Sequence, residues 1–133
     1  MIKNLLFLAG VAVLLFVGFK LFGRDKSDSS DVDSDTAENL LKENKKIVVL
    51  DVRTPKEYAG GRIAGAVNMD FYDNDFEKKL AALDKDKSYL VHCAVGGRSA
   101  KVRNMMRTHQ FKSIYHLEGG MKAWEQAGKS VTR

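Results

Sequence analysis

The stretch Val91–Ala100, which reads VHCAVGGRSA, decides how the fold of this chain is interpreted. It begins in Tyr89–Cys93, a short apolar run typical of a buried strand, and continues into Ser99–His109, whose pattern predicts a helix. Two glycines lie between them. In α/β sheets ligands bind beyond the carboxyl ends of the strands. We therefore expect Cys93, at the end of its strand, to lie in a binding site.

Strand and helix patterns alternate on both sides of this stretch. Strands are expected over Ile47–Val52, Ala66–Met69 and Ile114–Leu117, and helices over Thr36–Glu43, Phe76–Leu83 and Met121–Ala127. Ser34 or Asp35 is available to cap the first helix, and Pro55 and Glu57 suit the first turn of another short helix. The alternation predicts an α/β layered fold with a mostly parallel central sheet flanked by helices.

The loop from Ala94 to Arg98 is expected to wrap around the sulfur of Cys93. Glycines adopt positive φ, so backbone N–H groups can converge on one point, and the following helix adds its N-terminal amides. With the charge of Arg98, these groups favour the thiolate and lower a cysteine pKa from about 8.5 to roughly 3.5–7.5. The alternative interpretation is that Cys93 is not a nucleophile but a small apolar residue that fills space in the core. The expected binding residues are Ala94, Val95, Gly96, Gly97, Arg98 and Ser99.

The length of this loop separates phosphate chemistry from sulfur chemistry. Protein tyrosine phosphatases carry His-Cys, five residues, then Arg and Ser or Thr. Here His92-Cys93 and Arg98-Ser99 match, but only four residues lie between them. A shorter loop fits the terminal sulfur of a persulfide better than a tetrahedral phosphate. A phosphatase or arsenate reductase remains the alternative enzyme.

Three further segments resemble the successive signatures of single-domain rhodaneses. They are DVRTPKEY (51–58), GRIAGAVN (61–68), and Glu118-Gly119-Gly120 followed by Trp124. The resemblance implies a rhodanese-like fold and a sulfurtransferase without a cofactor. Cys93 would then take a sulfane sulfur from an anionic donor such as thiosulfate, and a thiol, cyanide or protein acceptor would remove it. Arg62 stands where many members have histidine, a position that serves packing.

The remaining polar residues of these segments have mainly structural interpretations. Asp51 and Arg53, at a strand end, are expected to form an internal ion pair, and Arg53 is also a candidate for substrate contact. His92 should point to the opposite face from Cys93. The other histidines lack partners at metal-ligand spacing, so no metal site is expected.

Composition restricts the class of protein further. Cys93 is the one cysteine, which rules out an intramolecular disulfide and a cysteine-built zinc site. The formal net charge is +5, but the basic residues are spread along the chain and aromatic residues do not interleave with them. We therefore expect no nucleic-acid partner.

The N-terminus has the composition of a membrane segment. Leu5–Phe19 carries no charge, and two more apolar residues follow Lys20, so the segment is close to the roughly 17–20 residues that a span needs. No small-x-small cleavage pattern follows, which favours a transmembrane anchor over residues 1–23 rather than a signal peptide. Residues 24–35, RDKSDSSDVDSD, are expected to be a flexible tether, and 36–133 the folded domain.

The expected location is the membrane, through residues 5–22, as a single-pass protein of a bacterial cytoplasmic membrane. Lys20, Arg24 and Lys26 follow the apolar run, against Lys3 and the terminal amine before it. This balance favours a cytoplasmic location for the C-terminal domain by one charge, and a periplasmic location is the alternative. The anchor also motivates a non-enzymatic alternative, a sulfur carrier or docking domain at the membrane.

Overall fold

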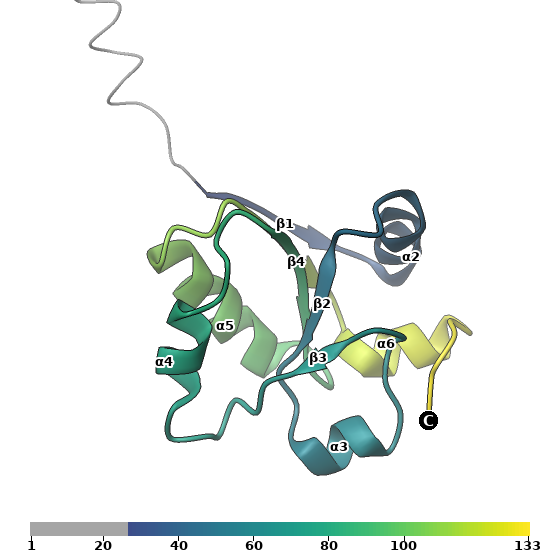
Figure 1. The fold of residues 1–133 in the computed structure, drawn as a ribbon. Coiled ribbons are helices and arrows are strands. Elements are labelled where there is room, and N and C mark those ends of the chain that lie inside the picture. The colour runs from purple at the N-terminus through teal and green to yellow at the C-terminus, as the bar shows by residue number, and fades with distance from the viewer. Residues whose placement is uncertain (1–26) are drawn as a thin grey trace, which may run out of the picture.

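The computed structural model describes residues 27–133, which form a five-stranded parallel sheet with helices on both faces (Figure 1). The strands are β1 (Asp28–Val32), β2 (Val48–Asp51), β3 (Val67–Asn68), β4 (Ser88–His92) and β5 (Ser113–Leu117). The helices are α2 (Ser34–Glu43), α3 (Pro55–Ala59), α4 (Phe76–Ala81), α5 (Gly97–Thr108) and α6 (Gly120–Gln126). The strand order is β1-β5-β4-β2-β3, and every pair is parallel. The predicted α/β fold with a parallel sheet is confirmed.

Two apolar cores lie on the two faces of the sheet. One packs α4 and α5 against alternate residues of the strands, among them Leu50 and Val91. The other packs α2 and α6 against Val49 and Leu90, which adjoin Leu50 and Val91 in the same strands. Figure 1 shows these two pairs of helices on opposite sides of the strands. This burial on both faces explains why β2 and β4 read as continuous apolar runs rather than as alternating ones.

β1 corrects the expectation that residues 24–35 form a tether, because Asp28–Val32 is an edge strand. Its backbone pairs with β5 from Asp28 opposite Ser113 to Val32 opposite Leu117. Only Val32 of this strand is buried. An edge strand needs backbone partners but few apolar side chains, so its composition resembles that of a solvated linker. The ordered domain therefore begins ahead of residue 36.

Helix boundaries differ from the expected ones by one or two residues. The cap of α2 is Asp33, whose side chain accepts a hydrogen bond from the amide of Thr36 at 2.8 Å, rather than Ser34 or Asp35. α5 begins at Gly97, two residues before the expected start, so Gly97 belongs to the first helical turn.

The predicted membrane anchor falls outside the described part of the chain. Residues 1–23, with the expected membrane contact over 5–22, precede the first described residue. Within residues 27–133, none of the helices combines the length and the apolar character that a membrane span requires.

The N-terminus of α6 packs directly against the segment that follows β4. The amide of Met121 donates to the carbonyl oxygen of Cys93 at 2.9 Å, and that of Lys122 donates to the carbonyl oxygen of Ala94 at 3.0 Å. Gly120 has a φ of +57°, and a Cβ there would lie 2.4 Å from the carbonyl oxygen of Cys93. The close approach of the two segments therefore requires glycine at this position.

Removing β1 tests whether this strand belongs to the folded domain. A chain of residues 33–133 keeps the Asp33 cap but loses the β1 pairing and the burial of Val32. We expect its free energy of unfolding to fall by about 2 kcal/mol relative to residues 27–133, the value of burying one valine. Urea unfolding of the two chains measures the difference, and equal stabilities would contradict the role of β1.

Gly120→Ala tests the contact between α6 and the segment after β4. Gly128 has a φ of +73°, and a Cβ at that position would have no atom within 4 Å, so Gly128→Ala is a matched control for backbone conformation alone. We expect the control to lose about 1–2 kcal/mol of unfolding free energy and Gly120→Ala about 3 kcal/mol or more. Equal losses in urea unfolding would show that no clash exists at Gly120.

Candidate active site

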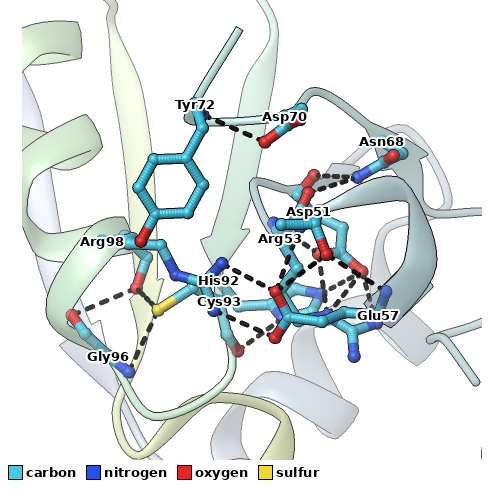
Figure 2. Close-up of polar contacts among 12 residues, drawn as sticks. Asp51, Arg53, Glu57, Asn68, Asp70, Tyr72, His92, Cys93, Gly96 and Arg98 are labelled. Atoms are coloured by element: carbon cyan, nitrogen blue, oxygen red, sulfur yellow. Dashed lines mark hydrogen bonds and ion pairs between the residues drawn. The ribbon is translucent and has the colours of Figure 1, made fainter.

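Cys93 directly follows β4, and its side chain is buried under the active-site loop, Ala94–Gly96. The loop turns back at Gly96, whose φ of +113° is open to glycine and strained for other residues. The Gly96 amide donates to Cys93 Sγ at 3.1 Å, and the hydroxyl of Ser99, in the first turn of α5, lies 3.3 Å from it. Figure 2 shows the sulfur of Cys93 within this turn, with the amide of Gly96 directed at it. The loop thus surrounds the sulfur with hydrogen-bond donors.

These donors change the acidity of the thiol. Burial alone raises the pKa of Cys93, because the charged form is desolvated. The hydroxyl of Ser99 and the amides of Ser99, Gly96 and Val95 act in the opposite sense and prevail, so the pKa lies below its ordinary value. The net effect favours a nucleophilic thiolate.

The other loop residues of the predicted set have different surroundings. Val95 exposes 64% of its surface, so it faces solvent although its amide faces the sulfur. The carbonyl oxygen of Ala94 is held by α6. Gly97 starts α5 and is exposed.

Arg98 is paired with Glu57 of α3, a contact that the sequence did not predict. The two guanidinium NH₂ groups donate to the two carboxylate oxygens of Glu57 at 2.8 and 3.0 Å. The guanidinium carbon of Arg98, Cζ, also lies 5.7 Å from the ring centroid of Tyr72 (Figure 2). The hydrogen bond from Arg98 is the main reason that the pKa of Glu57 falls to about 2, and burial acts against it. The pKa of Arg98 is raised chiefly by the same bond.

Glu57 has a second role that its position in the sequence does indicate. It is the third residue of α3, where its side chain accepts from the Thr54 amide at 3.2 Å while Thr54 Oγ1 accepts from the Glu57 amide at 3.2 Å. This capping box fixes the carboxylate that receives Arg98. A partner 41 residues away along the chain leaves no local sequence signal.

Asp51 and Arg53 form the buried ion pair that the sequence predicts. Arg53 donates to Asp51 Oδ2 at 2.7 Å and to the carbonyl oxygen of Gly61 at 2.8 Å. The guanidinium is therefore directed to these two groups, whereas Gly96 and Ser99 contact the sulfur. Substrate contact by Arg53 stays a prediction.

His92 is buried beside Asp51 and contacts the backbone of Cys93 rather than its sulfur. Its Nδ1 lies 3.2 Å from the carbonyl oxygen of Cys93, and its Nε2 lies 3.6 Å from Asp51 Oδ2. Burial lowers the pKa of His92 and outweighs the opposing effect of Asp51, so the imidazole is neutral at pH 7. This placement agrees with the expectation that the side chain of His92 points away from that of Cys93.

Two other features lie apart from the sulfur. A pocket of about 480 Å³ lies between α2, α6 and residues 63–65, lined in part by Leu41, Ile47 and Trp124 of the other core. Among residues 27–133, no group of three or more His, Cys, Asp or Glu side chains could hold a metal ion. The chemistry of the donors around Cys93 makes this residue the centre of the candidate active site.

Comparison with known proteins agrees with this arrangement. Residues 33–127 match the family described as Rhodanese-like domain. The putative sulfurtransferase YtwF of Bacillus subtilis is 33% identical over 95 residues, covering 71% of this chain and 89% of the relative. A sulfurtransferase of Allochromatium vinosum is 24% identical over 102 residues, covering 77% and 94%.

A solved structure leads to the same family. The crystal structure of a rhodanese-related protein from Thermoplasma volcanium superposes with a TM-score of 0.67 at 31% identity, covering 77% of this chain and 97% of that one. Together with the family match over most of residues 27–133, this likeness shows that the chain belongs to the rhodanese-like domain family.

Proposed function

We propose that this protein is a sulfurtransferase that moves a sulfane sulfur from an anionic donor such as thiosulfate to a thiol or cyanide. The observation that carries the proposal is the sulfur of Cys93, buried under a loop whose Gly96 amide and Ser99 hydroxyl contact it. Such donors stabilise an anionic sulfur, both as thiolate and as persulfide. The relatives named sulfurtransferase support the same chemistry.

The reaction has two displacement steps at sulfur. The Cys93 thiolate attacks the outer sulfur of thiosulfate, a new S–S bond forms, and sulfite leaves with the electron pair of the broken bond. The acceptor then attacks the outer sulfur of the Cys93 persulfide, and the Cys93 thiolate leaves. The enzyme thus alternates between two forms in a ping-pong cycle.

Burial of the thiol suits a persulfide carrier. Cys93 is 1% exposed, so its sulfur lies beneath the loop surface. We propose that the second sulfur of the persulfide, bonded to Sγ at about 2.05 Å, is held by the amides of Val95, Gly96 and Ser99 that act on Cys93. Those amides offset the negative charge that develops on the outer sulfur in both steps.

Arg98 supports the binding of an anionic donor, and Glu57 fixes where its charge lies. The charge of Cys93 contributes to the raised pKa of Arg98, so the two groups interact electrostatically. The bidentate pairing with Glu57 holds the guanidinium in one orientation.

Cys93→Ser tests the persulfide, because a hydroxyl in place of the thiol keeps the shape of the site but accepts no sulfur. Incubation with thiosulfate followed by intact-mass spectrometry should show one added sulfur atom on the native protein and none on the variant. Cyanide should remove that sulfur.

Two results would contradict the proposal. One is addition of sulfur to the Cys93→Ser chain, which would place the carrier elsewhere. The other is hydrolysis of an aryl phosphate by a native protein that takes up no sulfur, which would favour the phosphatase alternative.

Arg98→Ala and the double variant Arg98→Ala/Glu57→Gln separate the charge of Arg98 from that of Glu57. The single variant leaves an unpaired carboxylate that repels an anionic donor. We expect its kcat/KM for thiosulfate to fall about tenfold or more at low salt, and less at high salt because exposed charges are screened.

The double variant removes the repelling carboxylate, so it should recover part of the lost kcat/KM. Initial rates across a range of ionic strength measure both effects. A double variant no faster than Arg98→Ala would show that Glu57 does not act through its charge.

A further inference from the structure

A chain of three hydrogen-bonding side chains continues from the sulfur of Cys93 into the sheet. Ser99 Oγ lies 3.3 Å from Cys93 Sγ and 2.7 Å from His116 Nε2. His116 Nδ1 lies 3.1 Å from Asp31 Oδ1. The fold creates this juxtaposition, because His116 of β5 and Asp31 of β1 are opposite each other in the parallel pairing and Ser99 lies on α5.

The chain of contacts runs from the interior to the surface. Cys93, Ser99 and His116 are 1%, 0% and 6% exposed, whereas 43% of the Asp31 side chain is exposed. The inner groups are thus shielded from bulk water. The hydroxyl of Ser99 is therefore the direct path for a proton between the thiol and the imidazole.

The hydrogens of this chain have two consistent arrangements. The Asp31 carboxylate favours a hydrogen on His116 Nδ1. If Nε2 is bare, it accepts from the Ser99 hydroxyl, and Ser99 Oγ accepts from the thiol of Cys93. If Nε2 carries a hydrogen, it donates to Ser99 Oγ, and the Ser99 hydroxyl donates to the thiolate. The carbonyl oxygen of Gly96, 3.3 Å from Ser99 Oγ, is a more distant acceptor than Nε2.

We propose that Ser99, His116 and Asp31 form a proton relay that activates Cys93. The S–H bond of Cys93 breaks as Ser99 Oγ takes that proton, and the hydroxyl hydrogen of Ser99 passes to His116 Nε2. The products are a thiolate and an imidazolium joined through the serine hydroxyl, with Asp31 stabilising the imidazolium. His116 and Asp31 are positioning residues, since they act through Ser99. The relay serves the proposed sulfur transfer, but its effect on the thiol is measurable without a sulfur donor.

The other charged groups around His116 decide how strongly the imidazolium is favoured or opposed. Arg103 of α5 donates to Asp31 Oδ1 at 2.5 Å and lies 3.5 Å from His116 Nδ1, so its charge opposes an imidazolium. His92 of β4 interacts with His116 but is neutral at pH 7. Burial raises the pKa of Asp31, yet the hydrogen bonds of Arg103 and His116 keep it below the usual value, so the carboxylate is ionised at pH 7.

The rate at which iodoacetamide alkylates Cys93, measured against pH, tests the relay in the full chain. In His116→Gln the side-chain amide still donates to Ser99 but accepts no proton. We expect the midpoint of its profile to rise by about one pH unit, with a rate about tenfold lower at pH 7. Asp31→Asn should move the midpoint in the same direction by less. His109→Gln is the matched control, because His109 at the end of α5 lies beside Glu77, and its profile should match that of the native protein.

A double-variant cycle separates a relay from a general effect of the imidazole charge. Ser99→Ala also raises the midpoint, because it removes a direct donor to the thiolate. In the Ser99→Ala background, His116→Gln should cause no further shift, since the path is already cut. Shifts that add would overturn the relay, as would a His116→Gln profile identical to the native one.

Two further outcomes remain decisive. Loss of the native near-ultraviolet circular dichroism in His116→Gln would show that this variant does not fold. The Asp31→Asn variant, changed at an exposed side chain, then replaces it in the test. An unchanged alkylation profile in Asp31→Asn would overturn the relay. If the profiles shift as expected while thiosulfate adds no sulfur to Cys93, the relay stands and the proposed sulfur transfer fails.

Discussion

The hydrogen bonds from α6 to the carbonyl oxygens of Cys93 and Ala94 are the contacts on which the rest of the site depends. A loop that turns its amides toward one sulfur needs partners for its carbonyls, because buried backbone groups are costly to leave unpaired. The amides of Met121 and Lys122 supply these partners, and Gly120 allows the approach. The last helix therefore shapes a loop that lies well before it in the chain, and the chemistry of Cys93 follows from that shape.

Stabilisation of the sulfur and recognition of charge are divided between different groups. Neutral donors, the backbone amides and the Ser99 hydroxyl, contact the sulfur. The full charge of Arg98 is paired with the carboxylate of Glu57. Neutral donors at the sulfur stabilise the thiolate without tying it into an ion pair, which keeps the nucleophile available to a donor. The relay through His116 extends the same division, because the charged carboxylate of Asp31 lies at the surface end of the chain of contacts.

The parts of the fold that were predictable from the sequence are those with local signals. The buried runs of β2 and β4, the glycines around Cys93 and the apolar face of α4 identify the α/β architecture and the position of the thiol. β1 was missed because its pairing uses backbone groups at a sheet edge and its side chains are polar. Long-range partners were missed as well: Glu57 and Arg98 are 41 residues apart, and Asp31 and His116 are 85 apart. Nothing near His116 in the sequence indicates its partners, because the parallel register of β1 and β5 brings it to Asp31 and the packing of α5 brings it to Ser99.

The most direct test of the account is the thiolate absorbance of Cys93, followed in the ultraviolet as pH rises, in the native protein and in protein unfolded by urea. Cys93 is the one cysteine, so the thiolate signal reports a single site. The donors around the sulfur predict a midpoint lower in the native protein than in the unfolded chain. An equal or higher native midpoint would show that burial prevails over the loop, and would contradict the claim that this site is built to hold an anionic sulfur.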